Sequence, residues 1–151
     1  MTTTRPDAAA TLRDAGLRVT RPRTAVIDEL WQHPHADADT ISTAVRARLG
    51  KVSKQAIYDV LYALHDAGLV RRLEPAGSPA LFELHRDDNH HHLVCRNCGA
   101  VADVACAVGE APCLDPSQTH GYAVEEAELV FWGLCPRCAG QDATQDVGAV
   151  P

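Results

Sequence analysis

The sequence predicts an α+β protein, with a winged helix-turn-helix domain over residues 1–84 and a smaller α/β domain over residues 90–140. Three observations lead to this prediction. Helical periodicity fills most of the first half and gives way to two short strand-like runs joined by a turn-rich link. A C-x2-C pair occurs twice in the second half, 40 residues apart. The charges are also divided unevenly between the halves, which indicates two domains with different tasks.

Helix-capping residues define the first two helices. Apolar residues at helical spacing predict a helix over residues 7–15, which Gly16 stops. Thr20 is expected to cap a second helix with Pro22 in its first turn, and His33-Pro34 ends it.

The next two helices are joined by a short link. Asp37 or Asp39 can cap a third helix that ends at Gly50, and Ser53 can cap a fourth that closes near Gly68. The pair is expected to form a helix-turn-helix, although many helical hairpins share this pattern. The outward side chains of the fourth helix would be Lys54, Gln55, Tyr58, Asp59 and Tyr62.

Two strand-like runs, 69–73 and 80–84, flank the turn-rich link 74–79 and predict the hairpin of a winged helix. Arg71 and Arg72 in this hairpin can approach a nucleic-acid backbone. They can equally be solvated charges on a strand edge, which discourage aggregation.

The second domain is expected to consist mainly of short strands, after a polar hinge at residues 85–89. Its predicted elements are strands at 93–95 and 101–104, a short helix within 112–120, one or two strands within 122–132 and a disordered tail at 141–151.

The two C-x2-C pairs supply four thiolates, which is the number that closes a tetrahedron around a structural Zn²⁺. The ligands would be Cys95, Cys98, Cys135 and Cys138. Disulfides or redox motifs are the alternative. The polar N-terminal segment has no apolar core typical of a secretory signal, so we expect a cytoplasmic protein with reduced thiols.

A second donor set lies beside the first cysteine pair, at His90, His91, His92 and Asp103. Nitrogen and oxygen ligands suit Fe²⁺, Mn²⁺, Ni²⁺ or a second Zn²⁺. On a strand, His90 and His92 would leave one face and His91 the other. The alternative is a solvated polar loop.

Charge favours a nucleic-acid partner for the first half only. Residues 1–75 carry 11 Lys/Arg against 9 Asp/Glu, whereas residues 76–151 carry 3 against 11. This asymmetry indicates a DNA-binding module joined to a sensing module. The cluster Arg18, Arg21 and Arg23 can contact phosphates or can be a solvated charge run.

In combination, these motifs resemble the ferric uptake regulator (Fur) family over roughly residues 12–139, and within it the actinobacterial FurA/CatR branch. The motifs are LRVTRPR at 17–23, HP at 33–34, SKQAIYDVL at 53–61, HHHLVCRNCG at 90–99 and WGLCPRC at 132–138.

The resemblance implies a homodimeric repressor that binds a pseudopalindromic double-stranded DNA operator. It implies structural zinc on the four cysteines and a regulatory Fe²⁺ or Mn²⁺ on a second set of ligands. That second set would be His33, Glu83, His90, His92 and Asp103. The residues expected to contact DNA are Arg18, Arg21, Arg23, Ser53, Lys54, Gln55, Tyr58 and Arg71.

The FurA/CatR branch further implies control of a catalase-peroxidase gene and a response to iron and peroxide, with His33 and His90 as candidates for oxidation. Asp103, where iron sensors often carry Glu, matches the peroxide-sensing pattern. Asp59 replaces the Arg of many relatives, so the operator can differ. Ala127 and Asn89 replace ligands of a third metal site, and Cys106 and Cys113 fall outside the zinc set.

Other functions remain as alternatives. A zinc- or nickel-responsive regulator of the same family would use the same ligands. A metalloenzyme is disfavoured because the sequence has no HExxH pair and no zinc-deaminase pattern. A metal-buffering protein would leave the winged-helix pattern unexplained.

Overall fold

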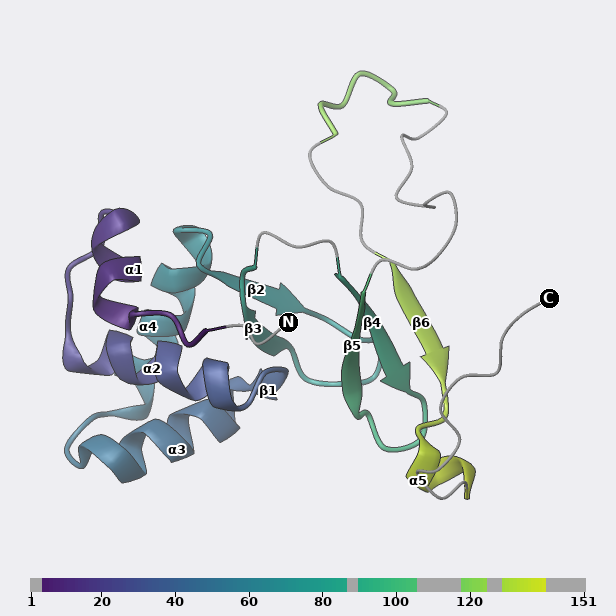
Figure 1. The fold of residues 1–151 in the computed structure, drawn as a ribbon, viewed down its shortest axis with the longest axis horizontal. Helices are drawn as coiled ribbons and strands as arrows, with labels where there is room; N and C mark the ends of the chain where they lie inside the picture. Colours follow the sequence, from purple (N-terminus) through teal and green to yellow (C-terminus); the bar gives the residue numbers. More distant parts are fainter. Residues whose placement is uncertain (1–3, 87–89, 106–117, 125–128, 141–151) are drawn as a thin grey trace. The chain divides into compact units, whose positions relative to one another are not determined.

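The structure is a computed structural model that describes residues 4–86, 90–105, 118–124 and 129–140. The chain divides into two compact units, Met1–Arg86 and Asp87–Pro151 (Figure 1). Residues 87–89 of the expected hinge and the expected disordered tail lie outside the described residues. None of the helices within the described ranges is long and apolar enough to cross a membrane.

Four helices begin the first unit, and each starts at a residue whose side chain accepts a hydrogen bond from the first turn. The helices are α1 (Ala8–Asp14), α2 (Arg21–Gln32), α3 (Ala38–Leu49) and α4 (Lys54–Asp66). Their N-caps are Asp7, Thr20, Asp37 and Ser53. The sequence left Asp37 and Asp39 open as the cap of α3, and Asp37 Oδ1 accepts from the Thr40 N–H at 2.8 Å.

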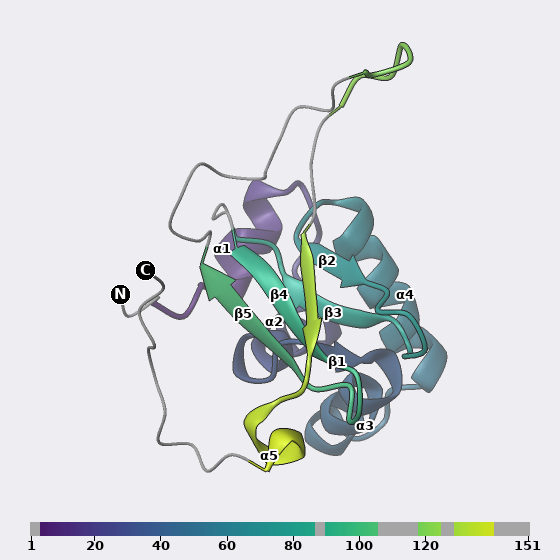
Figure 2. The same cartoon turned by 90° about the vertical axis from the view of Figure 1, so that its right-hand side faces the viewer.

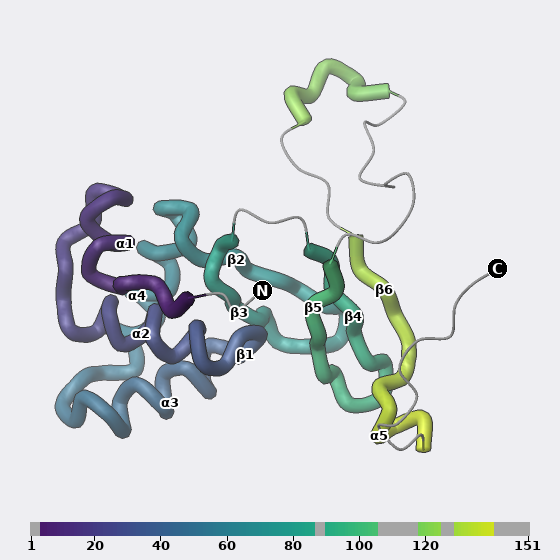
Figure 3. Tube along the Cα trace, viewed as in Figure 1, coloured from purple at the N-terminus to yellow at the C-terminus, as the bar shows by residue number. Residues whose placement is uncertain are grey.

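The apolar faces of these helices meet in one core. Leu12, Ile27, Ile41 and Ile57, one from each helix, have no exposed surface. Helices α2, α3 and α4 contact one another, and α1 contacts α2 (Figure 3). The core therefore holds α4 against α2 and α3 and leaves its opposite face exposed.

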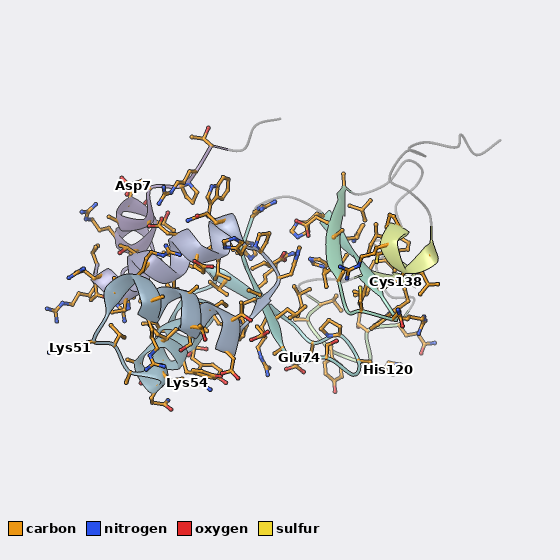
Figure 4. The ribbon with its side chains drawn as sticks, turned by 90° about the horizontal axis from the view of Figure 1, so that it is seen from below. Asp7, Lys51, Lys54, Glu74, His120 and Cys138 are labelled. Atoms are coloured by element: carbon orange, nitrogen blue, oxygen red, sulfur yellow. The ribbon has the colours of Figure 1, made fainter. Side chains whose placement is uncertain are left out.

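A three-stranded antiparallel sheet completes the winged-helix architecture of the first unit, in the order β1-β3-β2. Its strands are β1 (Ala36–Asp37), β2 (Val70–Leu73) and β3 (Leu81–Leu84). The hairpin of β2 and β3 confirms the predicted wing, and Glu74, labelled in Figure 4, begins its link. Strand β1 was not predicted, because two residues are too few to show alternation.

The second unit contains another three-stranded sheet, with β4 in the middle (Figure 2). Strand β4 (His90–Cys95) pairs antiparallel with β5 (Val101–Ala105) and parallel with β6 (Val130–Gly133). Helix α5 (Pro136–Ala139) follows β6; its single turn was too short to predict.

Two further expectations concern the second unit. The sequence predicts one or two strands within 122–132, and β6 is the strand that begins there among the described residues, whereas residues 122–124 form none. The predicted helix within 112–120 falls largely outside the described residues, and residues 118–120 are not helical.

Candidate metal centres and nucleic-acid interface

The four cysteines of the C-x2-C pairs converge at one end of the second sheet. Cys95 ends β4, Cys98 lies in the turn after it, and Cys135 is the N-cap of α5. Cys138, labelled in Figure 4, lies within α5. Their sulfur atoms all lie within 4.8 Å of one another, and Cys98 Sγ is 3.7 Å from Cys135 Sγ. A tetrahedral zinc with Zn–S bonds of about 2.3 Å requires S–S separations of about 3.8 Å. The donor set therefore fits Zn²⁺.

Hydrogen bonds favour thiolates at part of this cluster. The backbone N–H of Cys135 donates to Cys95 Sγ at 3.3 Å and, with the N–H of Cys98, lowers the pKa of Cys95 to about 6. The N–H of Ala100 lowers the pKa of Cys98. Since a metal binds the deprotonated sulfur, these N–H groups reduce the proton competition that zinc has to overcome.

Polar side chains surround the same sulfurs. The Asn97 amide donates to Cys138 Sγ at 3.3 Å, which lowers the pKa of Cys138, but hydrogen bonds with the Cys135 and Cys98 sulfurs and burial together outweigh it and raise this pKa to about 11. A hydrogen bond with Cys98 raises the pKa of Arg137. The Arg137 guanidinium can offset part of the negative charge of four thiolates around one divalent ion, and the Asn97 amide can stabilise one of them by its hydrogen bond.

A second group of potential ligands lies on β4 and β5. His92 pairs with Asp103 in the strand register, and its Nε2 is 3.6 Å from Asp103 Oδ1. His90 Nε2 lies 4.0 Å from the same oxygen. His91 leaves the other face of β4 and its ring packs edge-on against Phe131, as the predicted alternation requires. This half-set offers two imidazoles and one carboxylate.

The first unit pairs Glu83 with a histidine that the sequence analysis did not choose. His35 Nε2 lies 3.0 Å from Glu83 Oε2, because β1 and β3 pair and bring the residue before β1 next to β3. His33 lies elsewhere: its Nδ1 is 2.8 Å from Oε1 of buried Glu29, which also binds Arg48.

The backbone of His35 sets it apart from its neighbours, but the sequence gives little sign of its contact with Glu83. His35 adopts a left-handed backbone with φ 63°, which is uncommon outside glycine and recurs at functional sites. Its backbone N–H donates to the Phe82 carbonyl at 2.9 Å, which fixes its position beside β3. Only recognition of the two-residue strand β1 could have revealed this contact from the sequence.

The exposed face of α4 carries the predicted side chains. Lys54, Gln55, Asp59 and Tyr62 are exposed and Tyr58 is half-buried. Ser53 caps the helix, with its Oγ accepting from the Ala56 N–H at 3.1 Å. The hydroxyl of Ser53 is therefore engaged in the fold of α4.

Asp39 at the start of α3 binds two of these residues. Its Oδ1 accepts hydrogen bonds from Lys54 Nζ at 2.5 Å and from the Tyr58 hydroxyl at 2.6 Å. The hydrogen bond from Lys54, and to a lesser extent that from Tyr58, lowers the pKa of Asp39. In turn, the Asp39 carboxylate raises the pKa of Tyr58. Asp39 thus holds the side chains at the N-terminal end of α4 in place.

The predicted cations of the first unit differ in their surroundings. Arg18 and Arg21 are exposed, whereas Arg23 is half-buried and donates to the Arg18 carbonyl oxygen at 2.8 Å. On the wing, Arg71 Nε lies 3.3 Å from His85 Nδ1, and Arg72 binds Glu74.

The model of the Ferric uptake regulator family matches residues 14–132. The chain belongs to this family. It is 57% identical over 140 residues to the transcriptional regulator FurA of Mycobacterium tuberculosis, covering 93% of this chain and 95% of that protein. It is 54% identical over 126 residues to ferric uptake regulation protein 1 of Mycolicibacterium fortuitum, covering 83% of this chain and 78% of that protein.

Solved structures agree with this assignment. The ferric uptake regulator of Pseudomonas aeruginosa with manganese has a TM-score of 0.64 at 27% identity, covering 86% of this chain and 98% of that chain. The Vibrio cholerae Fur has a TM-score of 0.64 at 26% identity, covering 85% and 100%. The relatives named above are regulators, which agrees with the expectation of a protein that is not an enzyme.

Proposed function

We propose that this chain is a metal-dependent, DNA-binding transcriptional repressor that senses iron and hydrogen peroxide and controls a catalase-peroxidase gene and its own promoter. The observation that carries the proposal is the 57% identity to FurA over 93% of the chain. The two kinds of donor set and the exposed face of α4 support it.

The four cysteines would hold a structural Zn²⁺, and a regulatory Fe²⁺ or Mn²⁺ would take nitrogen and oxygen ligands. For the regulatory ion we propose His35 in place of His33, because His35 is the histidine that lies on Glu83. The remaining ligands would be Glu83, His90, His92 and Asp103.

These regulatory ligands come from both units of the chain. An ion that takes ligands from both would restrict their relative orientation and stabilise one conformation over others. In a cytoplasmic homodimer, that conformation would place the two α4 helices in successive major grooves of a pseudopalindromic operator. Arg18 and Arg21 would contribute phosphate contacts, as would Arg71 on the wing.

Peroxide sensing would follow from the choice of metal. When bound, Fe²⁺ supplies electrons for the reduction of hydrogen peroxide beside its own ligands. His90 and the histidine of residues 33–35 that serves as ligand are the candidates for oxidation. An oxidised imidazole is a weaker donor, so the ligand set would lose its affinity and repression would end.

The test is an anaerobic gel-mobility experiment with a duplex of the chain's own promoter and Fe²⁺, Mn²⁺, Zn²⁺ or Ni²⁺. The wild type should retard the duplex with Fe²⁺ or Mn²⁺ and release it after chelation. Retardation that is independent of metal would contradict the proposal, and retardation with Zn²⁺ or Ni²⁺ alone would assign a zinc or nickel regulator.

Two neighbouring variants make the ligand assignment specific. His35→Ala should weaken the metal response by more than about 100-fold, because loss of a ligand exceeds the 10- to 100-fold cost of losing an outer-shell partner. His33→Ala removes another histidine two positions earlier, and this variant should respond to metal like the wild type. If His33→Ala lost the metal response and His35→Ala kept it, His33 would be the ligand instead of His35.

A further inference from the structure

Gln55 and Asp59 form a pair on the exposed face of α4. They lie one turn apart, and Gln55 Nε2 donates to Asp59 Oδ1 at 2.8 Å. Both side chains are exposed. Two of the other outward residues, Lys54 and Tyr58, are bound to Asp39. The pair is therefore a distinct feature of this face, in the N-terminal half of α4.

The carboxylate fixes which way the Gln55 amide faces. An ionised carboxylate only accepts hydrogen bonds, so Gln55 has to turn its NH₂ group towards Asp59. The amide oxygen then faces away from Asp59, and one N–H of the NH₂ group remains available beside it. The pair offers one acceptor and one donor side by side.

This arrangement matches one base edge in the major groove. Adenine presents an acceptor, N7, beside a donor, the N6 amino group, and the amide of Gln can bond both. Guanine presents two acceptors, N7 and O6, so its O6 would face the amide oxygen of Gln55. The negative charge of Asp59 also disfavours a base edge or phosphate without a donor.

We propose that Asp59 is a specificity-determining residue that orients the Gln55 amide so that the pair reads one adenine in each half of the operator. This inference rests on the proposed function, because it requires α4 to enter the major groove. It assigns a positioning role to the residue at which this chain departs from the arginine common in relatives.

The experiment selects binding sites from a random-sequence duplex library with metal-loaded full-length protein. The wild type and the variants Gln55→Ala, Asp59→Ala, Asp59→Asn and Asp66→Ala are compared. Asp66 is an exposed acid at the end of the same helix, so Asp66→Ala removes an equal charge without touching Gln55. Asn at position 59 keeps an oxygen that can accept from Gln55.

The wild type should select adenine at one position in each half-site, and guanine there should weaken binding by about 10- to 100-fold. This preference should fall to within about threefold in Gln55→Ala and Asp59→Ala, and it should persist in Asp66→Ala. Asp59→Asn should retain only part of the preference, because the Asn amide can donate as well as accept and so no longer fixes the Gln55 amide in one orientation. Binding of all variants to unselected DNA should not fall below that of the wild type, since a purely structural defect would lower both.

Two results would overturn the inference while leaving the proposed function intact. One is an unchanged adenine preference in Asp59→Ala, and the other is a base other than adenine at the position that depends on Gln55. Failure of the wild type to select any sequence would instead refute the proposed function, and the inference with it.

Discussion

The cysteine cluster should decide whether the second unit folds at all. Among the described residues of this unit, only Val94 and Cys95 are buried hydrophobic residues. Burial of a side chain of this size contributes about 1.5–3 kcal/mol. Ordering each residue costs about 1–2 kcal/mol of backbone entropy. The apolar burial of the described residues is therefore too small to offset the entropy lost in ordering three strands and a helix. Zinc bound by a structural site contributes on the order of 10–16 kcal/mol at neutral pH.

We therefore expect Cys98→Ser to lose zinc and unfold the second unit while the first unit stays folded. Hydrogen exchange read by mass spectrometry should show protection lost in β4 and β5 and kept in α2 and α4. The first unit has its own core, to which α2, α3 and α4 all contribute, and contains none of these cysteines. Zinc content should fall in parallel.

Asn97→Ala is the matched control, because it removes a hydrogen bond to Cys138 Sγ and no ligand. It should weaken zinc binding by about 10- to 100-fold and leave the unit folded at saturating zinc. The reasoning would be refuted if Cys98→Ser retained one zinc per chain with full protection of β4.

Three further predictions concern the first unit. Ile57→Ala should lower the free energy of unfolding by about 2–5 kcal/mol in urea denaturation, because Ile57 has no exposed surface; a loss below about 1 kcal/mol would contradict the packing described for α4. Ser53→Ala should lower it by about 1 kcal/mol through loss of the N-cap, and an unchanged unfolding midpoint would argue against that role. Asp39→Ala should lower the pKa of Tyr58 towards the ordinary tyrosine value, because the carboxylate accepts the phenol hydrogen bond and opposes the phenolate charge. Phenolate absorbance during an alkaline titration measures this shift, and a titration identical to wild type would contradict the contact.

Local signals made much of the fold predictable. Thr20 and Ser53 both cap the helices that they were expected to cap, because an N-cap depends on residues within one turn. The C-x2-C pairs were equally informative, since their number and spacing predicted the four sulfur atoms that the fold brings together. The wing followed from the short apolar runs on either side of a turn-rich link.

Contacts between distant residues were not predictable. His35 and Glu83 are 48 positions apart and meet through the two-residue strand β1, which leaves no periodic pattern in the sequence. The contacts of Asp39 with Lys54 and Tyr58 likewise depend on how α3 and α4 pack. The sequence suggests His33 as the ligand that accompanies Glu83, whereas the structure is needed to see that His35 lies beside Glu83.

The most direct test of the proposed repressor is the mass of the protein after a brief equimolar pulse of hydrogen peroxide. Anaerobic Fe²⁺-loaded and Mn²⁺-loaded samples would be compared by intact mass, by peptide fragmentation and by operator binding. We predict single-oxygen additions at His90 and at one histidine of residues 33–35, with iron only, together with loss of DNA binding. Two unmodified samples that bind DNA throughout would contradict peroxide sensing and indicate a regulator that reports metal supply.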